Sequence, residues 1–521
     1  MRSARSFPVY VRERGLFRVI AILGFMVFGL IILPACGSLP ALARATATLT
    51  KNPTGSTQES TATERATMMV IASSTALPAE ALESTPTHLP LGSQLAEDGA
   101  WVLISTDDGL WAINQDGSGL TQLTNLAVEM DDLSDAVSSQ GGYVAFVTWE
   151  EDYSNKTLQV LRLPTGEIIA SIPLTTEETQ QGLGIQSGND FSLLEAIGEF
   201  AWSPDGDMLA FNGLLEGTTS DVYVYSVAEQ MVTRLTDEPT EAIKLHWSPD
   251  GKYIIHYSVH NFGAGAGYNM DGAWAAKADD SGVVYLYDPR DGDQTFHGWL
   301  TPTTFVVSSW DAKCGDHSIM SYDIETGVKR TILDTCFMGA ALETDGSHIM
   351  VTIMDTNVDF CDCKNVEYQA GVHLISMDRI SPTWIYAENA YNPQWLDNVD
   401  MFIVTASDVI GFRLNGERIN FPFEVADLYP VISSPEGPWA YASTGPDTPA
   451  GLWIDTLHEP PDKVFGDPVQ SIIWVPDGSS LFFTSNGDFY MAHAPDYEPV
   501  FIADLSARDA AWVDLDESKG D

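Results

Sequence analysis

Three near-copies of one short phrase decide the fold of this chain. Residues 201–206 read AWSPDG, residues 246–251 read HWSPDG and residues 473–478 read IWVPDG. An alternating apolar stretch follows each phrase: MLAF, YIIHY and SLFFT. A strand containing Trp, a tight Pro-Asp-Gly turn and a second strand form a β-hairpin. We therefore assign a structural role to the Trp, Asp and Gly of each phrase: Trp202, Asp205, Gly206, Trp247, Asp250, Gly251, Trp474, Asp477 and Gly478.

The spacing of these phrases predicts the architecture. Trp202 and Trp247 are 45 residues apart, and Trp474 follows after about five times that spacing. A fixed period in the forties that is built from short strands indicates a β-propeller. With degenerate repeats starting near positions 137, 299, 341, 395, 433 and 512, nine repeats can be counted. The sequence predicts an all-β chain with a single propeller of eight or nine four-stranded blades over residues 98–516.

The two ends of the predicted propeller complement each other. Residues 101–104 (WVLI) read as a second strand that lacks a first strand, and residues 509–514 (DAAWVD) read as a first strand that lacks a second. Pairing of the two in one blade would close the ring and remove the free sheet edges that favour aggregation. Residues 517–521 would then form a short tail.

One stretch of the chain resembles a known family. Residues 109–124 (GLWAINQDGSGLTQLT) and the WSPDG phrases are similar to the repeat of TolB-like β-propellers. The resemblance covers roughly residues 99–515, and the motifs that carry it are structural. Members of the family include periplasmic scaffolds and the propeller domains of some peptidases. The resemblance therefore implies the fold, and function has to be argued from sites.

The N-terminal region has the order of a secretory signal. A basic stretch through Arg18 precedes an apolar run over 19–33, and residues 33–36 read LPAC. This ending resembles a bacterial lipobox, which implies a signal peptide over 1–35, cleavage before Cys36 and lipidation of its thiol. A plain signal peptide or a single membrane anchor is the alternative, although the run is short for a transmembrane helix. Residues 36–97, rich in Thr, Ser, Ala and Pro, predict a disordered tether.

The charge of the chain restricts its partners. It has 25 Lys and Arg against 73 Asp and Glu, a formal net charge of −48. Such a chain repels nucleic acids and anionic membrane surfaces. We expect a monomer on the outer face of the cytoplasmic membrane or at the cell surface, attached through its lipid only. Its expected partner is a protein, a peptide or a glycan, and not a nucleic acid.

Four further cysteines predict disulfides. An even number of cysteines in an exported chain favours disulfide bonds, and we favour Cys314 with Cys336 and Cys361 with Cys363. The other two connectivities remain open. A zinc site with four thiolate ligands is a further alternative, but the usual C-x2-C pairs are missing.

Insertions into the repeat are the places where function is expected. They cover residues 175–195, 256–281 and 355–370, and long loops of a propeller tend to gather on one face. We expect the longest, 256–281, to be a flexible glycine-rich loop. Within it, His256 and His260 with Asp271 are candidates for a metal or ligand site.

No motif in the sequence names a metal or a cofactor. Many aspartates lie in Asp-Gly dipeptides, which are turn signals first, and the full D-x-[DN]-x-[DN]-G pattern of a calcium loop is absent. We expect no cofactor and no dedicated metal site, with adventitious calcium at one or two turns as the alternative.

No catalytic motif is recognisable either. The G-x-S-x-G pentapeptide of the α/β-hydrolases and the S-x-D-x-G-x-x-W turns of sialidases do not occur, and no pair of acids stands out as that of a glycosidase. We expect no catalytic residues and a non-enzymatic, membrane-anchored lipoprotein whose propeller binds a protein or ligand. The alternative is a propeller enzyme, such as a glycosidase, lyase or metal-assisted hydrolase, that acts at the mouth of the central tunnel.

Overall fold

The computed structural model describes most of the predicted propeller. It describes residues 95–514 except for these segments: 97–99, 127–131, 150–155, 177–178, 180–196, 264–266, 288–292, 312–314, 354–367, 388–389, 397–400, 406–408, 420–427, 433–437, 444–450 and 456–461. The predicted signal peptide, Cys36 and the predicted tether lie outside these residues, as does the tail. Within the described part, no helix has the length and apolar character needed to cross a membrane.

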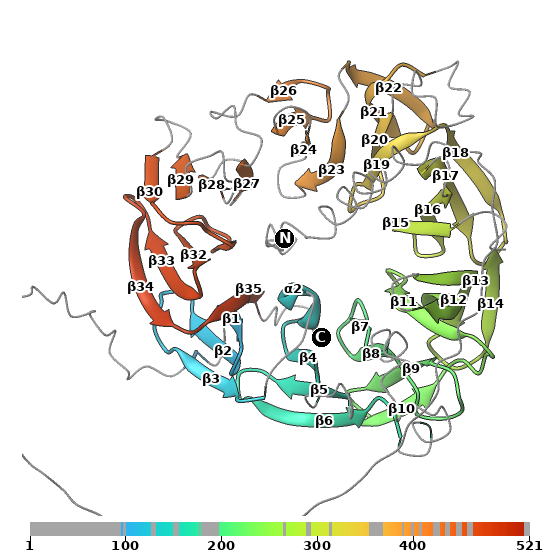
Figure 1. The fold of residues 1–521 in the computed structure, drawn as a ribbon, viewed down its shortest axis with the longest axis horizontal. Helices are drawn as coiled ribbons and strands as arrows, with labels where there is room; N and C mark the ends of the chain where they lie inside the picture. The colour runs from blue at the N-terminus through green and yellow to red at the C-terminus, as the bar shows by residue number, and fades with distance from the viewer. Residues whose placement is uncertain are drawn as a thin grey trace, which may run out of the picture. The chain divides into compact units, whose positions relative to one another are not determined.

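The described residues form nine antiparallel sheets around a ring, eight with four strands and one with three (Figure 1). The sheet that joins the ends of the ring contains β35 (Ala507–Asp514), β1 (Ala100–Thr106), β2 (Gly109–Asn114) and β3 (Thr121–Thr124). The three-stranded sheet contains β4 (Tyr143–Thr148), β5 (Thr157–Arg162) and β6 (Glu167–Pro173). The all-β propeller fold is thus confirmed, and the number of sheets matches the nine repeats counted in the sequence.

The remaining sheets follow in chain order, each with its first strand at the centre of the ring. The next three are β7 (Phe200–Trp202), β8 (Met208–Gly213), β9 (Asp221–Ser226) and β10 (Met231–Arg234); β11 (Glu241–Trp247), β12 (Tyr253–Gly263), β13 (Gly267–Lys277) and β14 (Val283–Tyr287); and β15 (Asp293–Thr301), β16 (Thr304–Asp311), β17 (Gly315–Asp323) and β18 (Lys329–Asp334).

The last four sheets have the same arrangement. They are β19 (Phe337–Leu342), β20 (His348–Ile353), β21 (Gly371–Ser376) and β22 (Ser381–Tyr386); β23 (Tyr391–Leu396), β24 (Met401–Thr405), β25 (Val409–Arg413) and β26 (Arg418–Ile419); and β27 (Leu428–Ile432), β28 (Trp439–Ser443), β29 (Gly451–Asp455) and β30 (Asp462–Phe465), followed by β31 (Ser471–Trp474), β32 (Ser480–Ser485), β33 (Asp488–His493) and β34 (Glu498–Asp504).

The Pro-Asp-Gly phrases form the predicted turns. Gly206 has a φ of 76°, a left-handed conformation that favours glycine, and its N–H donates to the carbonyl of Ser203 at 2.9 Å. Gly251 and Gly478 have φ angles of 68° and 72° and make the same turn bond. Trp202 then pairs with Leu209 across the hairpin. The three phrases are therefore hairpin turns between first and second strands, as predicted.

The tryptophans of the repeat join neighbouring blades. The indole Nε1 of Trp202 donates to the carbonyl of Ala136 at 2.9 Å, and that of Trp395 donates to the carbonyl of Ala341 at 2.8 Å. In each pair the acceptor lies on the innermost element of the preceding blade. Each tryptophan thus fixes one inner strand against the next.

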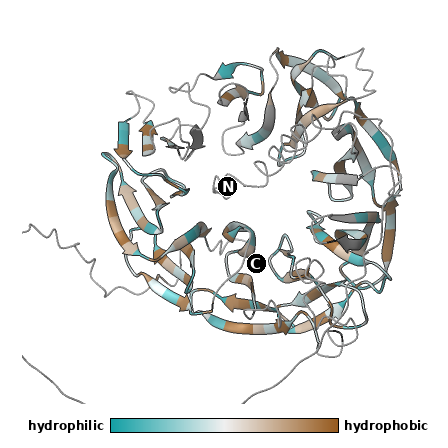
Figure 2. Cartoon of the chain, viewed as in Figure 1, coloured by the Kyte–Doolittle hydropathy of each residue, from teal (hydrophilic) through white to brown (hydrophobic). Residues whose placement is uncertain are grey.

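The core lies between the sheets. One buried cluster combines Ile255 and Tyr257 of β12 with Phe305 and Val307 of β16. Figure 2 shows hydrophobic residues recurring in strands all around the ring. This arrangement follows from the alternation along each strand, because successive side chains point toward the two neighbouring blades.

The ends of the ring meet in one sheet, as the sequence predicts. Strand β35 pairs with β1 from Ala100 opposite Asp514 onward, and Figure 1 shows the red β35 beside the blue β1. The buried side chain of Asp509 in β35 accepts hydrogen bonds from the N–H groups of Leu133 and Ala510 at 2.9 and 2.8 Å. The last strand therefore contacts both the first blade and the second.

One predicted first strand is wrong. Residues 136–138 align with the repeat, but the structure has a short helix, α2 (Leu133–Ala136), followed by a single bridge from Val137 to Val144. The side chain of Asp132 caps this helix by accepting from the N–H of Ser134 at 2.8 Å. The cap and the bond from Leu133 to Asp509 hold this segment in a helical turn, so its sheet keeps three strands.

The strand order gives the ring two different faces. The first strands of neighbouring blades run in the same direction: Trp247 and Trp395, each near the end of its strand, reach the corresponding ends of the preceding inner strands at Ala201 and Ala341. The Pro-Asp-Gly turns therefore all lie on one face, here called the turn face. Connections between second and third strands, and between successive blades, lie on the opposite face. Along the chain, the predicted insertions 175–195 and 355–370 fall between β6 and β7 and between β20 and β21, and 256–281 contains the connection between β12 and β13, so we call this side the insertion face.

Candidate functional site

The longest hairpin of the ring rises at the insertion face. Strands β12 and β13 have 11 residues each and pair from Tyr253 opposite Lys277 to Gly263 opposite Gly267. The prediction of a flexible loop over 256–281 is therefore wrong for most of its length. Ladder hydrogen bonds extend into the insertion because its first part continues the β-branched and aromatic pattern of the strand before the glycines begin.

A β-bulge in this hairpin redirects one acidic side chain. Ser258 pairs with Gly272 and Val259 pairs with Met270, so Asp271 is an extra residue on β13. Met270 and Ala273 both belong to the core cluster that faces the next blade. Without the bulge, strict alternation would place Asp271 on the same side as Ala273, inside that apolar core. The bulge instead leaves Asp271 on the other side of the strand.

There it meets a histidine of the facing strand. Nδ1 of His260 lies 2.5 Å from Oδ2 of Asp271, and their side chains are 44% and 33% exposed. A carboxylate at Nδ1 holds the proton on that nitrogen, which makes Nε2 the basic atom of the neutral ring. We call these two residues the His260–Asp271 pair. Such a pair can accept and return a proton at the insertion face.

The third predicted member of this site lies elsewhere. His256 is 0% exposed, and neither of its ring nitrogens has a hydrogen-bond partner in the described part of the chain. Burial lowers the pKa of His256 to about 4, so its ring is neutral. The structure thus brings His260 and Asp271 together and places His256 in the core. Among the described residues, no group of three or more His, Cys, Asp or Glu is arranged to hold a metal ion.

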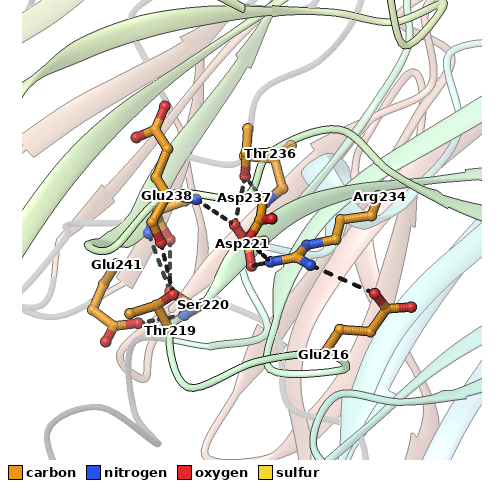
Figure 3. A network of polar contacts seen from close by, with 11 residues as sticks. Glu216, Thr219, Ser220, Asp221, Arg234, Thr236, Asp237, Glu238 and Glu241 are labelled. Carbon is orange, nitrogen blue, oxygen red and sulfur yellow. Dashed lines mark hydrogen bonds and ion pairs between the residues drawn. The ribbon is translucent and has the colours of Figure 1, made fainter. Parts of the chain in front are cut away.

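A network of ion pairs lies at the same face, in the neighbouring blade (Figure 3). Arg234 ends β10, and its Nη2 lies 2.6 Å from Oδ2 of Asp221 and 2.7 Å from Oδ1 of Asp237. Its Nη1 lies 3.5 Å from Oε2 of Glu216. The Asp221 side chain is 0% exposed, so the guanidinium neutralises a carboxylate that water does not reach.

Asp221 also receives neutral hydrogen bonds. The Thr236 hydroxyl donates to Oδ1 of Asp221 at 2.9 Å, and the N–H of Glu238 approaches the same oxygen at 3.4 Å. Burial nevertheless raises the pKa of Asp221 above its ordinary value, against the lowering effect of the bonds from Arg234 and Thr236. Asp221 therefore carries its negative charge against an unfavourable desolvation energy. This charge disfavours the ionisation of neighbouring carboxyl groups.

Two glutamates complete the network. Burial, followed by the charge of Asp221, raises the pKa of Glu238 to about 7, so this carboxyl gains and loses its proton near neutral pH. Burial also raises the pKa of Glu241, whose Oε2 accepts the N–H of Ser220 at 2.5 Å. In Figure 3 the Glu238 carboxyl extends away from Arg234. We call this group the acidic network: Glu216, Asp221, Arg234, Asp237, Glu238 and Glu241.

Strand pairing places the acidic network beside the His260–Asp271 pair. Glu241 begins β11 and lies opposite Val259 of β12, the residue immediately before His260. The hydroxyls of Thr240 and Ser258 make a close contact at the same level. One face of two adjacent blades therefore combines a histidine base, a carboxyl that titrates near pH 7 and a guanidinium.

Sequence reasoning missed the acidic network. The available signal was the acidic run 237–241 (DEPTE) just after a fourth strand, at a connection between blades. The acidic and proline-containing composition of this run predicts a solvent-exposed turn. Only the tertiary packing, which buries Asp221 at the start of β9 and half-buries Glu238, makes these carboxyls unusual.

The other predicted site residues have structural roles or lie outside the described part. Oδ1 of Asp205 accepts from the Ser203 hydroxyl at 2.5 Å, and Oδ1 of Asp250 accepts from the Ser248 hydroxyl at 2.8 Å, so both carboxylates brace their own turns. Incidental calcium binding at such turns stays a prediction. Cys336 is buried and disulfide-bonded. The pairing also stays a prediction, because the remaining cysteines are outside the described residues: Cys314, Cys361 and Cys363.

The sequence resembles a peptidase over one short stretch, and no family model matches the chain. Over 54 residues it is 43% identical to the "Uncharacterized peptidase YuxL" of Bacillus subtilis. The match covers 10% of this chain and only 8% of that relative, so most of the peptidase has no counterpart in the alignment.

Solved structures share the fold at low sequence identity. A eukaryotic initiation factor has a TM-score of 0.52 and 10% identity, covering 79% of this chain and 98% of that chain. TolB from Acinetobacter baumannii has a TM-score of 0.29 and 16% identity, covering 55% and 63%. The β-propeller domain of the Trilobed protease from Pyrococcus furiosus has a TM-score of 0.35 and 14% identity, covering 64% and 97%.

These similarities correct one expectation. The prediction of a non-enzymatic chain is wrong, because the matching stretch of sequence belongs to a peptidase. The TolB-like resemblance implied a β-propeller, and the strand order confirms that architecture. The described residues form a β-propeller whose nine sheets close through β35.

Proposed function

We propose that this chain is a propeller enzyme that acts at its insertion face, with His260 as the acid–base group. The observation that carries the proposal is the 2.5 Å contact between His260 Nδ1 and Asp271 Oδ2 on the longest hairpin of that face. The bulge that creates this contact supports a functional origin, because it places an acidic residue where regular alternation would have buried it.

The proposed chemistry is hydrolysis. Nε2 of His260 takes a proton from the attacking water and returns it to the leaving group, while Asp271 stabilises the imidazolium that forms in between. Glu238, with a pKa of about 7, is the second group able to carry a proton at this face. A positioned acid–base group of this kind contributes about 10²–10⁴-fold to a rate.

The proposed substrate is a peptide. The short match to a peptidase supports this choice over a glycan. The acidic network has five carboxyl groups and one guanidinium, so the face disfavours phosphorylated or sulfated substrates and favours neutral or basic peptides. This preference agrees with the strongly acidic composition of the whole chain.

The proposed location is outside the cytoplasmic membrane. The basic, apolar and LPAC segments support export, cleavage before Cys36 and lipid attachment, and residues 36–97 would tether a propeller that spans 98–516. Expression of the full chain and of Cys36→Ser with a radiolabelled fatty acid tests this. Label and membrane association that both persist in Cys36→Ser would contradict lipid attachment at this cysteine.

The enzymatic proposal is tested with detergent-solubilised full-length protein. It is incubated with a library of neutral and basic peptides and, in parallel, with a panel of oligosaccharides, and products are detected by mass spectrometry. We expect peptide cleavage that falls by about 10²–10⁴-fold in His260→Gln, and a clear loss in Asp271→Asn, which removes the charge that stabilises the imidazolium.

The matched control is His493→Gln. His493 is also an exposed histidine whose Nδ1 has a polar partner, the Ser480 hydroxyl at 2.6 Å, but it lies on the turn face. Its substitution should leave the activity unchanged. Full activity in His260→Gln would exclude His260 as the acid–base group. Saturable peptide binding without any turnover would instead favour a binding protein.

A further inference from the structure

A cavity lies at the turn face, opposite the insertion face that carries the His260–Asp271 pair. It has a volume of about 490 Å³ and is lined from the turn face of three consecutive blades. Pro249 contributes from one turn, His297 and Trp299 from the end of β15, and Glu343 and Asp345 from the end of β19 and its turn. A volume of this size admits a small organic molecule or one large side chain.

The charged side chains that line this cavity are all acidic. They are Glu343 and Asp345, and the lining contains neither Lys nor Arg. Oε2 of Glu343 accepts from the Ser347 hydroxyl at 2.5 Å and lies 2.8 Å from Nδ1 of His348. Oδ1 of Asp345 accepts the N–H of Ser347 at 2.8 Å. These bonds fix both carboxyl groups in the lining of the cavity, where they attract a positive charge.

The wall of the cavity provides an aromatic surface. Trp299 is held edge-on against Phe296 and Phe305, with ring centroids 5.9 and 5.7 Å away. Nε2 of His297 is buried without a hydrogen-bond partner in the described part of the chain. Burial lowers the pKa of His297 to about 4, so this ring adds no positive charge that would oppose a cation.

We propose that this cavity binds an organic cation with a guanidinium or ammonium head. The head lies between the carboxylates of Glu343 and Asp345, and the aliphatic stem packs on Trp299. Carboxylates with a rigid indole suit this chemistry, because the indole attracts cations through its face and covers an apolar stem. The site lies on the turn face and goes beyond the proposed hydrolysis at the insertion face.

The test is calorimetric titration of the full-length protein with Nα-acetyl-L-argininamide (argininamide below), whose only charge is the guanidinium. Its uncharged isostere, Nα-acetyl-L-citrullinamide, is titrated in parallel. We expect the citrulline compound to bind at least about fivefold more weakly, the effect of one partly exposed charge pair. Higher ionic strength should weaken only the arginine compound. Equal binding of the two compounds, or no heat of binding for argininamide up to millimolar concentrations, would overturn the proposal.

The site is located with Asp345→Asn. Asparagine keeps the oxygen that accepts the Ser347 N–H, so the turn is retained while its charge is lost. Asp477→Asn is the matched control, because Asp477 makes the same bond to the N–H of Ser479 at 2.8 Å in another blade. We expect about fivefold weaker binding of argininamide in Asp345→Asn alone. Wild-type affinity in Asp345→Asn would overturn the assignment.

A capped Gly-Arg-Gly peptide separates the two sources of such a cation. Tighter binding of the peptide than of argininamide assigns the cavity to a basic side chain of a polypeptide, and the reverse order assigns it to a free small molecule. Both results support a cation site. Binding at this cavity should be unchanged in His260→Gln, so its outcome is independent of the proposed enzymatic activity.

Discussion

The indole Nε1 of Trp247 donates a 2.8 Å hydrogen bond to the carbonyl oxygen of Ala201, which lies beside the corresponding tryptophan of the preceding blade. The repeated phrase therefore does two things at once. Its Pro-Asp-Gly part turns the chain within a blade, and its Trp joins that blade to the one before. A motif of this kind sets both the local hairpin and the curvature of the ring.

Replacement of Trp247 by Phe should lower the free energy of unfolding by about 1–2 kcal/mol. The substitution keeps most of the buried ring but leaves the carbonyl of Ala201 without its donor. Urea denaturation followed by far-UV circular dichroism measures the change. Trp310→Phe, at a side chain that is 42% exposed, is the control and should change stability by less than about 0.5 kcal/mol. Equal effects of the two substitutions would argue against the bond between blades.

Replacement of Arg234 by Met should destabilise the chain by about 3–5 kcal/mol, because it leaves the buried carboxylate of Asp221 without its counter-charge. The double variant Arg234→Met with Asp221→Asn should recover part of this loss, since the unpaired charge is then absent. Denaturant midpoints of the three proteins check the prediction. A double variant less stable than Arg234→Met alone would contradict it.

Stability should fall as the pH rises through the titration of Glu238. Its pKa is about 7 in the folded chain, against an ordinary value of 4.5, so between these values the folded state binds more protons than the unfolded state. The contribution is present below about pH 4.5 and is lost as the pH passes 7. Since the side chain is only half-buried, we expect about 1 kcal/mol after screening by solvent.

Glu238→Gln isolates this effect. Glutamine does not titrate, so the difference in denaturant midpoint between pH 5 and pH 8 should become smaller than in the unsubstituted chain. Glu229→Gln, at an exposed turn of the same blade, should leave the difference as it is. A pH dependence that is identical in Glu238→Gln would assign the titration to another group.

Replacement of Asp509 by Ala should loosen the closure of the ring. The N–H groups of Leu133 and Ala510 would lose their acceptor, at a cost of about 1–3 kcal/mol for each buried donor. Hydrogen exchange should accelerate in β35, β1 and α2 and stay unchanged in β16, which lies in another blade. Uniform acceleration over all strands would indicate a general loss of stability instead of local opening.

The architecture was predictable because its signals are local and repeated. Each Pro-Asp-Gly turn is specified by a few adjacent residues, and the regular recurrence of the phrase makes a propeller the consistent solution. The orphan strands at the two ends then predicted the pairing of β1 with β35. The prediction of a first strand at Val137 was wrong because it rested on a local alignment. The alignment does not include Asp509, whose side chain accepts a hydrogen bond from the N–H of Leu133 from a distant part of the sequence.

The candidate site was predictable only in part. His260 and Asp271 were singled out by residue type, but the bulge that brings them together has no signal in the sequence. His256 differs from His260 by four positions along one strand, yet one is in the core and the other is at the surface. The raised pKa of Glu238 arises from burial against Asp221, a contact that no short pattern in the sequence encodes.

The pairing of β35 with β1 also determines when the first blade can be completed during synthesis of the chain. The hydroxyl of Ser105 binds the carbonyl of Asp509, 404 residues later, so the first blade stays incomplete until nearly the whole propeller has been synthesised. During that interval β1 presents an unpaired inner edge, the kind of edge that captures foreign strands. Contacts this distant along the chain also slow folding. A chain that is synthesised from its N-terminus therefore depends on protection of β1 until its last strand arrives.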